Sequence, residues 1–380
     1  MKKRIAWIGE TSPSEDYFSI PELIIKENYH RVNPSFHGSF DEIIFVENNL
    51  SDFFTWPLII DEMVRLIDNE GIFSLKVRIS SSFFSIVSLN NKLYGLSEGK
   101  IHLESFLYEQ DNIIIKFKFI RRATNIDNTW SFGIVWDGKN EDFLIKYINS
   151  INNQSIKTQY EIIICGPYIN LENNMNCHFI NADETVEKYS NISSKKNLIV
   201  QKALYENICI VHNRYELDKN FIESFNYFGL DFDIVVVSQK LLDGRRVPDW
   251  ISQSSNFIFT NNYLLNYDDY SPYQYIGGGM MIAKRTTLLK YKWNELLVWN
   301  TGEDIEISKR LKDNGIEPRF NKYTSVNVLN LRKGILEDFI SLSTIDLLMA
   351  NYDIYKIKNE KNYIFICFDY FKKLIKKLMN

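Results

Sequence analysis

The sequence lacks the features that define several common classes of protein. Its four cysteines are scattered without a CxxC pair, so neither a disulfide framework nor a structural zinc site is indicated. No apolar run approaches the roughly 18 residues of a membrane-spanning helix, and the short apolar run near the N-terminus fits a first strand better than a signal peptide. The net charge of −4 gives no electrostatic reason to expect nucleic-acid binding. We therefore expect a cytoplasmic protein that binds no nucleic acid.

The first third of the chain alternates short apolar strands with amphipathic segments. "RIAWIGE", "DEIIFVE" and "GIFSLKV" are expected to be strands, and "WPLIIDEMVRLIDNEG" between the last two is expected to be a helix that stops at its glycine. This order predicts a right-handed parallel unit. Residues 102–122 are expected to form a helix and then an alternating strand. Residues 1–125 are therefore predicted to be a small α/β domain.

Part of this domain resembles a class I methyltransferase. The resemblance consists of an acidic strand end, a helix, the "NEG" turn, a strand and a closing hairpin-like segment. Such enzymes approach their cofactor through a glycine-rich loop, whereas "ETSPSEDYF" follows the first strand here. The domain is therefore interpreted as degenerate, with a structural or docking role. Binding of S-adenosylmethionine would instead indicate methyl transfer.

A second α/β pattern follows the polar bridge "RRATNIDNTW" and occupies residues 126–335. The strands "SFGIVWDG", "YEIIICG" and "NICIVHNRY" alternate with helical segments. Such alternation predicts a doubly wound, Rossmann-like, mostly parallel sheet, which binds ligands beyond the carboxyl ends of its strands. With 380 residues, 45% of them hydrophobic, the chain is long and apolar enough for two such domains.

Five motifs occur in this half of the chain in a set order. They are "SFGIVWDGKN", "EIIICGP", "SSKKNLIVQKALYENICIVHNRY", "IGGGMMIAKR" and "GEDIEISKRL". Together they resemble the GT-A glycosyltransferases, most closely glycosyltransferase family 2, over about residues 130–330. The resemblance implies a hexosyltransferase-like enzyme that moves a sugar from a nucleotide-sugar donor to a glycan or glycolipid acceptor. It also implies inversion at the transferred carbon and a role in surface polysaccharide synthesis.

The resemblance places the sugar donor near two of these motifs. Asp137 and Gly138 follow the first strand, where the base or ribose of the nucleotide is bound, although "WDGKN" is equally typical of a turn. Lys196 corresponds to the basic residue of the family, whose cation would neutralise the diphosphate. The alternative for Lys196 is a solvated surface lysine.

The DxD motif, which binds the metal in this family, is replaced here. Its position holds His212, Asn213 and Arg214. Mg²⁺ prefers oxygen ligands, while Mn²⁺ also accepts imidazole, so a metal held by His212 and Asn213 would be Mn²⁺ rather than Mg²⁺. Alternatively, Arg214 supplies the positive charge and no metal is needed. His212 could also be an ordinary core histidine.

Two further segments are assigned to the acceptor. The loop "LLDGRRVPDW" combines carboxylates, a cation and an aromatic ring, a mixture that binds sugars, although its "DG" pair is also typical of a turn. Its candidate residues are Asp243, Arg245, Asp249 and Trp250. In the run "GGG", Gly278 and Gly279 are assigned to the acceptor side because glycine lets the backbone approach a ligand. A flexible hinge is the alternative.

The adjacent acids Glu303 and Asp304 begin a segment with helical spacing. Thr301 is expected to cap this helix, and Gly315 to end it. Acids in a first turn also complement the helix dipole, which is a structural role. In family 2 the aspartate of this pair is the general base that takes the proton of the acceptor hydroxyl. We therefore predict that Asp304 is catalytic, with Glu303 beside it.

A second class of function is compatible with the same motifs. A chain derived from a glycosyltransferase that lost its DxD acids would be a non-catalytic nucleotide- or glycan-binding protein. The glycine run and the "ED" pair favour the enzyme.

Residues 336–380 are predicted to form a basic, helical tail. Residues 356–380 contain seven lysines against Glu360 and Asp369. On a helix over residues 364–379, apolar side chains and lysines fall on opposite faces, which is typical of an interfacial helix on an anionic membrane. Packing on the body of the protein and a solvated end are the alternatives. The first interpretation makes the protein peripheral on the inner face of the membrane.

If residues 364–379 contact lipid, deleting them should release the protein from vesicles that contain anionic lipid, without lowering activity on soluble acceptors. Vesicle co-sedimentation of the full-length and shortened proteins measures this, with neutral vesicles as the control. A shortened protein that no longer folds would show that the segment belongs to the core.

Overall fold

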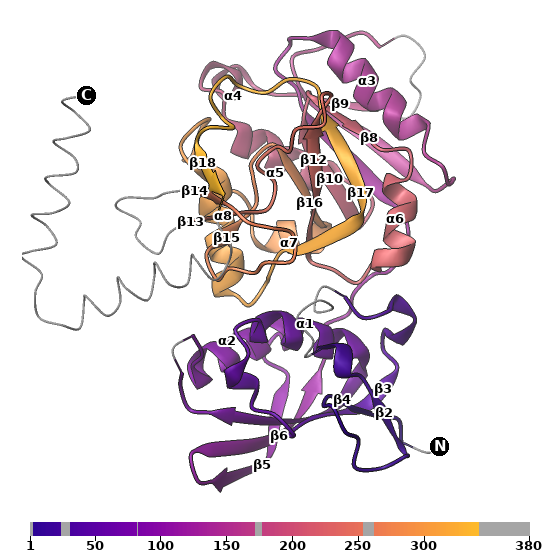
Figure 1. The fold of residues 1–380 in the computed structure, drawn as a ribbon. Coiled ribbons are helices and arrows are strands. Elements are labelled where there is room, and N and C mark those ends of the chain that lie inside the picture. Colours follow the sequence, from indigo (N-terminus) through magenta and orange to yellow (C-terminus); the bar gives the residue numbers. More distant parts are fainter. Residues whose placement is uncertain (1–2, 24–30, 82, 172–176, 254–261, 342–380) are drawn as a thin grey trace, which may run out of the picture.

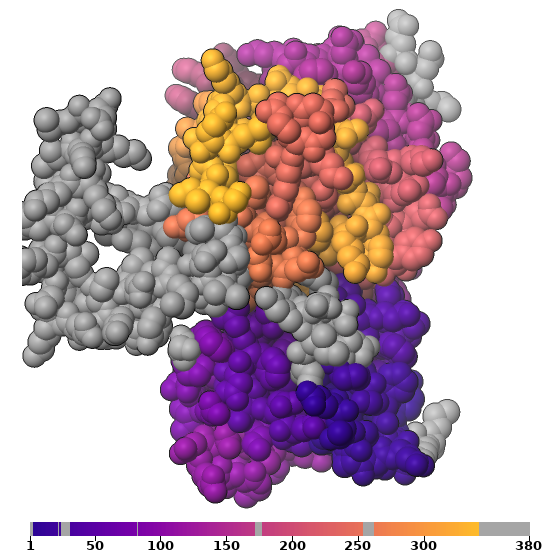
Figure 2. All heavy atoms as spheres, in the orientation of Figure 1, coloured from indigo at the N-terminus to yellow at the C-terminus, as the bar shows by residue number. Residues whose placement is uncertain are grey.

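The protein consists of two domains, one stacked on the other (Figure 1). Each domain is built on its own sheet, and the space-filling view shows the two bodies in contact (Figure 2). The predicted tail helix lies outside the described residues. The computed structural model describes residues 3–23, 31–81, 83–171, 177–253 and 262–341.

The smaller domain has a six-stranded sheet in the order β2-β1-β3-β4-β6-β5. The first four strands in this order are parallel, and β5 and β6 form an antiparallel hairpin. Two helices cover one face of the sheet and lie between it and the larger domain (Figure 1). The elements are β1 (Ile5–Trp7), β2 (Tyr17–Ser19), β3 (Phe40–Phe45), α1 (Trp56–Leu66), β4 (Ile67–Arg78), α2 (Ile86–Ser97), β5 (Ile101–Glu109) and β6 (Asn112–Ile120), with short 3-10 turns at Pro21–Leu23, Pro34–Phe36 and Leu50–Asp52.

Two expectations for this domain are wrong. The first helix was expected to run to Gly71, but α1 ends at Leu66 and β4 begins at the next residue. The segment expected to be the second helix is strand β5, which pairs along its length with β6 across a turn at Gln110. Pairing with β6 satisfies the backbone groups of β5, and this overrides the helix-like spacing of its apolar residues.

The larger domain has an eight-stranded sheet in the order β11-β17-β12-β16-β10-β7-β8-β9. Four of its pairings are parallel, and β16 is antiparallel to both of its neighbours. The predicted α/β, Rossmann-like fold is confirmed. The elements are β7 (Trp130–Val135), α3 (Glu141–Asn152), β8 (Tyr160–Gly166), β9 (Cys177–Asn181), α4 (Glu184–Lys188), α5 (Ile192–Lys202), β10 (Asn207–His212), β11 (Tyr215–Leu217), α6 (Phe221–Phe228), β12 (Ile234–Leu241), β16 (Met280–Lys284), α7 (Arg285–Lys290), α8 (Glu303–Asp313) and β17 (Arg319–Val328).

Helices cover both faces of this sheet. One apolar core packs α3 and α6 against it, and another packs α5, α7 and α8 against the other face. A third, small sheet lies beside α8 and joins β15 (Gln274–Tyr275), β13 (Ile251–Gln253), β14 (Asn262–Leu264) and β18 (Phe339–Ser341). Because β18 pairs with β14, the larger domain continues past residue 335, the boundary expected from the sequence. Within the described ranges, none of the helices has both the length and the apolar character that a membrane crossing needs.

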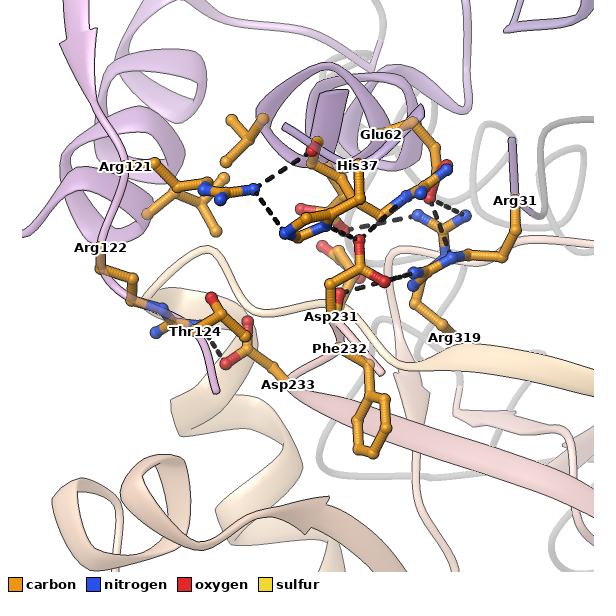
Figure 3. Close-up of a pocket in the computed structure, with 15 residues that line it drawn as sticks. Arg31, His37, Glu62, Arg121, Arg122, Thr124, Asp231, Phe232, Asp233 and Arg319 are labelled. Carbon is orange, nitrogen blue, oxygen red and sulfur yellow. Dashed lines mark hydrogen bonds and ion pairs between the residues drawn. The ribbon is translucent and has the colours of Figure 1, made fainter. Parts of the chain in front are cut away.

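The two domains are joined by a buried network of charged side chains (Figure 3). Asp231 of the larger domain accepts hydrogen bonds from Arg31 at 2.5 Å and from the ring of His37 at 2.7 Å, and its carboxylate lies 3.3 Å from Arg65. Glu62 in α1 pairs with Arg65 of its own helix. Burial works to raise the pKa of Asp231, but its arginine partners outweigh burial and hold that pKa well below its usual range.

Asp231→Asn should weaken the contact between the domains, because it leaves Arg31 and Arg65 buried with less opposing charge. Breaking a buried ion pair on one side costs about 3–5 kcal/mol, so the free energy of unfolding in urea should fall by a comparable amount. The matched control is Asp52→Asn, which breaks an exposed pair with Arg78 and should cost less than about 1 kcal/mol. Equal, small losses in both variants would contradict this role.

Candidate functional site

The main pocket of the larger domain lies beyond the end of β10 and has a volume of about 740 Å³. Because β7, β8 and β10 are parallel, this is the edge where their carboxyl ends meet, as the sequence predicts. The wall combines residues from the end of β10, the glycine run before β16, the start of α8 and residues 330–339, together with Val247 and Pro248 of the loop "LLDGRRVPDW" and Ile251 just after it. The predicted residues that line it are His212, Arg214, Gly278, Gly279, Glu303 and Asp304.

The two acids at the start of α8 are tied to the glycine run. Asp304 accepts a hydrogen bond from the Gly278 N–H at 2.9 Å, and its other oxygen accepts one from Ile305 N–H at 2.9 Å. Glu303 is buried and lies 3.4 Å from the ammonium group of Lys196, which donates to the carbonyl of Gly278 at 3.0 Å. One glycine therefore connects both carboxylates and a buried lysine.

These contacts correct two expectations. Lys196 is buried rather than solvated, and it does not itself line the pocket. The N-cap of α8 is Gly302 and not Thr301, whose hydroxyl donates to the carbonyl of Val298 instead. Gly315 follows the last residues of the helix with φ +80°, in agreement with its predicted role.

Burial is the main influence on the pKa of Asp304. It raises the pKa of this carboxyl group, the charge of Glu303 raises it further, and Lys196 and the Gly278 N–H act in the opposite direction. The sequence predicts an aspartate kept ionised by the helix N-terminus. The structure adds an environment that moves the Asp304 pKa upward, toward the range in which a base can also release a proton.

His212 is a pocket residue and not a core histidine. Its backbone N–H donates to the carbonyl of Gly279 at 3.0 Å, which holds the end of β10 against the glycine run. Its Nε2 is buried and has no hydrogen-bond partner among the described residues. Burial lowers the pKa of His212 well below its usual value, and the nearby cations Lys196 and Arg214 lower it further. Both effects favour the neutral form of the ring.

Asn213 and Asp137 hold a turn together outside this pocket. The amide nitrogen of Asn213 donates to Asp137 at 3.1 Å and to the carbonyl of Lys139 at 2.7 Å. The same oxygen of Asp137 accepts from the Lys139 N–H at 3.0 Å, and Gly138 has φ +78°. These contacts match the turn interpretation of "WDGKN", and neither Asp137, Gly138 nor Asn213 lines the pocket.

The residues at the DxD position do not fit a divalent ion. His212 lines the pocket while Asn213 bonds to the turn, so the two predicted ligands do not form one site. No group of three His, Cys, Asp or Glu side chains that could hold a metal occurs in the described part of the chain. Glu303 is paired with Lys196, and Asp304 is bonded to backbone N–H groups. The oxygen ligands that Mg²⁺ and Mn²⁺ prefer are therefore missing or engaged.

The predicted acceptor loop divides into two parts. Asp249 and Trp250 are buried, so the expected sugar platform is wrong for them: Asp249 binds Arg246 at 2.8 Å, and the Trp250 ring N–H donates to the carbonyl of Asp269 at 2.7 Å. Asp243 and Arg245 are exposed and pair with each other. They line a second pocket of about 500 Å³, which shares residues 330–332 with the main one.

Several wall residues were not predicted. Trp299 and Asn300 lie directly before the "ED" segment, and Tyr275 precedes the glycine run. Their closeness to these motifs is the signal that could have identified them. Residues 330–339 also line the pocket, and no local pattern in the sequence indicates this.

No protein-family model matches the sequence, and no curated protein sequence matches it. Among solved structures, a crystal structure of GalNAc-T7 with UDP, GalNAc and Mn²⁺ matches 58% of this chain and 47% of its own, at 14% identity and a TM-score of 0.43. S. aureus TarS 1-349 in complex with UDP-GlcNAc matches 54% of this chain and 59% of its own, at 13% identity and a TM-score of 0.37. The chain thus spans about half the length of these proteins.

The similarity is to a glycosyltransferase-type fold and assigns no activity or substrate to this chain. None of the comparisons supports the methyltransferase resemblance of residues 1–125.

Gly278→Ala should disturb the two carboxylates. The added Cβ would lie 2.8 Å from a Glu303 carboxylate oxygen and 3.3 Å from one of Asp304, so the buried Glu303–Lys196 pair must shift. Overpacking of this kind costs about 1–3 kcal/mol, measurable by thermal unfolding. Gly277→Ala is the matched control, because its Cβ meets nothing closer than 3.7 Å. Equal stability of the two variants would show that the carboxylates move freely.

Proposed function

We propose that the protein is a glycosyltransferase that moves a sugar from a nucleotide-sugar donor to a hydroxyl group of a glycan or glycolipid acceptor. The observation that supports this most is the meeting of the glycine run, the "ED" helix start and the end of β10 around one pocket at the carboxyl edge of the sheet. These segments belong to three of the five motifs on which the family resemblance rests. They lie far apart in the sequence and share the wall of a pocket large enough for a sugar and a diphosphate.

The proposed reaction is a single inverting displacement. The acceptor hydroxyl gives its proton to Asp304 as its oxygen forms a bond to the anomeric carbon of the donor sugar. The bond from that carbon to the diphosphate breaks at the same time, and the nucleoside diphosphate leaves with the electron pair. The hydrogen bond from Gly278 N–H fixes the direction of the Asp304 carboxylate, and a fixed base is effective only within hydrogen-bond reach of the proton it takes.

A non-catalytic nucleotide- or glycan-binding protein is the second candidate, favoured by the replacement of the DxD acids by His212, Asn213 and Arg214. Incubation with a panel of nucleotide sugars, with and without Mn²⁺, separates the two. Release of nucleoside diphosphate supports the enzyme. Binding without release supports the second candidate. A role in surface polysaccharide synthesis, at the inner face of the membrane, belongs to the first proposal, as does a docking role for residues 1–125.

Asp304→Asn should abolish most turnover, because the amide cannot accept the proton. Loss of a general base lowers rates by about 10²–10⁴-fold, measured as initial rates with the donor that the panel identifies. Stability should change little, since asparagine can still accept one of the two backbone hydrogen bonds. Glu303→Gln should be milder and should weaken acceptor binding more than turnover.

The control on the same helix is Glu306→Gln, which changes a half-buried pair with Arg310 outside the pocket wall and should leave the rate unchanged. Retained turnover in Asp304→Asn, with equal losses of stability in the Asp304 and Glu303 variants, would mean that these acids only cap the helix.

A further inference from the structure

One guanidinium in the pocket wall, that of Arg214, has no carboxylate partner among the described residues. Two arginines line the pocket within the described ranges, and Arg332 faces Asp338 at 3.6 Å. Arg214 has no salt bridge to any described residue, and its buried Nε has no hydrogen-bond partner among them. Nε2 of His212, two residues earlier, is buried without a partner as well. Two nitrogen-bearing side chains therefore border the pocket with unused hydrogen-bonding capacity.

The backbone and the glycine run fix Arg214 in place. Its N–H donates to the carbonyl of His212 at 2.7 Å, and its own carbonyl accepts from Leu329 N–H at 2.8 Å. A Cβ on Gly279 would lie 3.3 Å from the Arg214 Nη2 and 2.4 Å from the hydroxyl of Tyr215. Glycine at position 279 therefore leaves the space that this guanidinium and its neighbour occupy.

The charges around this position suit an anion and oppose a cation. Arg214 and Lys196 both act on His212 electrostatically, and both lower its affinity for a proton. The same charges would repel a divalent ion placed beside His212. Two of the pocket carboxylates already face other cations, because Glu303 pairs with Lys196 and Asp338 faces Arg332, while Asp304 is directed at the Gly278 N–H.

We propose that Arg214, with His212 beside it, binds the diphosphate of the donor directly, in the place where related enzymes use a metal ion. This inference rests on the proposed function and specifies how its donor is held. A guanidinium presents paired N–H groups that match two phosphate oxygens, and its charge does not depend on pH in the physiological range. It would oppose the negative charge that develops on the leaving diphosphate, while neutral His212 adds a hydrogen bond in the tautomer with its proton on Nε2.

Isothermal titration calorimetry on the full chain tests this with pyrophosphate and a panel of UDP, GDP, CDP, ADP and dTDP. Each titration is run in EDTA and again with Mn²⁺. We expect the wild-type protein to bind pyrophosphate and at least one nucleotide with equal affinity in both buffers. Arg214→Met should bind them about 10- to 100-fold more weakly in both, since charge-assisted hydrogen bonds are lost. Arg214→Lys should be intermediate, and Arg310→Met, two turns further along α8 and not part of the pocket wall, should match the wild type.

A double variant provides the converse test. His212→Asp together with Arg214→Asp restores an acid-x-acid sequence, and its nucleotide binding should be lost in EDTA and recovered with Mn²⁺. If wild-type binding itself requires Mn²⁺, direct binding by Arg214 is overturned and the proposed glycosyltransferase stands. If no diphosphate binds in either buffer, both proposals fail. The wild-type comparison requires no variant, so it decides the question even if a substituted protein does not fold.

Discussion

The contact between the two domains depends on the carboxylate of Asp231. It lies between Arg31 and Arg65 and accepts a hydrogen bond from His37 (Figure 3). Arg121 contacts the other ring nitrogen of His37, and because a guanidinium can only donate, that nitrogen must be the acceptor. The Nδ1–H of His37 is then directed at Asp231. A buried acid with such partners needs all of them, since removing one leaves charge without compensation.

The same network reaches the sheet that supports the pocket. Glu62, which pairs with Arg65, also lies 3.1 Å from Arg319, the first residue of β17. β17 runs beside β12 to Val328, and the next residue, Leu329, donates to the carbonyl of Arg214. The chain then enters the 330–339 segment of the pocket wall. The smaller domain is therefore fixed to the strand whose far end positions Arg214.

Short-range patterns in the sequence predict those features of the structure that neighbouring residues determine. The α/β order, α8 with Gly315 at its end, and the gathering of "GGG" and "ED" at the strand ends follow from periodicity, turn chemistry and motif order. Burial of Trp250 does not, because it depends on a partner, Asp269, that no pattern around Trp250 specifies. Strand β5 was missed for a similar reason, since only its pairing with β6 distinguishes it from a helix. The charges of the domain interface join residues up to 261 positions apart, beyond any sequence window.

The residues His212, Asn213 and Arg214 at the DxD position are better explained by a change in the charge of the site than by a loss of its function. If the two acids had simply been lost, the end of β10 would carry no charge. The surrounding residues would then have no reason to accommodate the side chains that replaced the acids. Here the fit is close: only glycine at position 279 leaves room for the Tyr215 hydroxyl and the Arg214 guanidinium. Asp304 and Glu303 meanwhile keep partners, Gly278 and Lys196, that hold them at the pocket. Under the proposed function, fixed acids on one side of the wall and, on another, a guanidinium that pairs with no described carboxylate would keep the proton acceptor apart from the anionic leaving group.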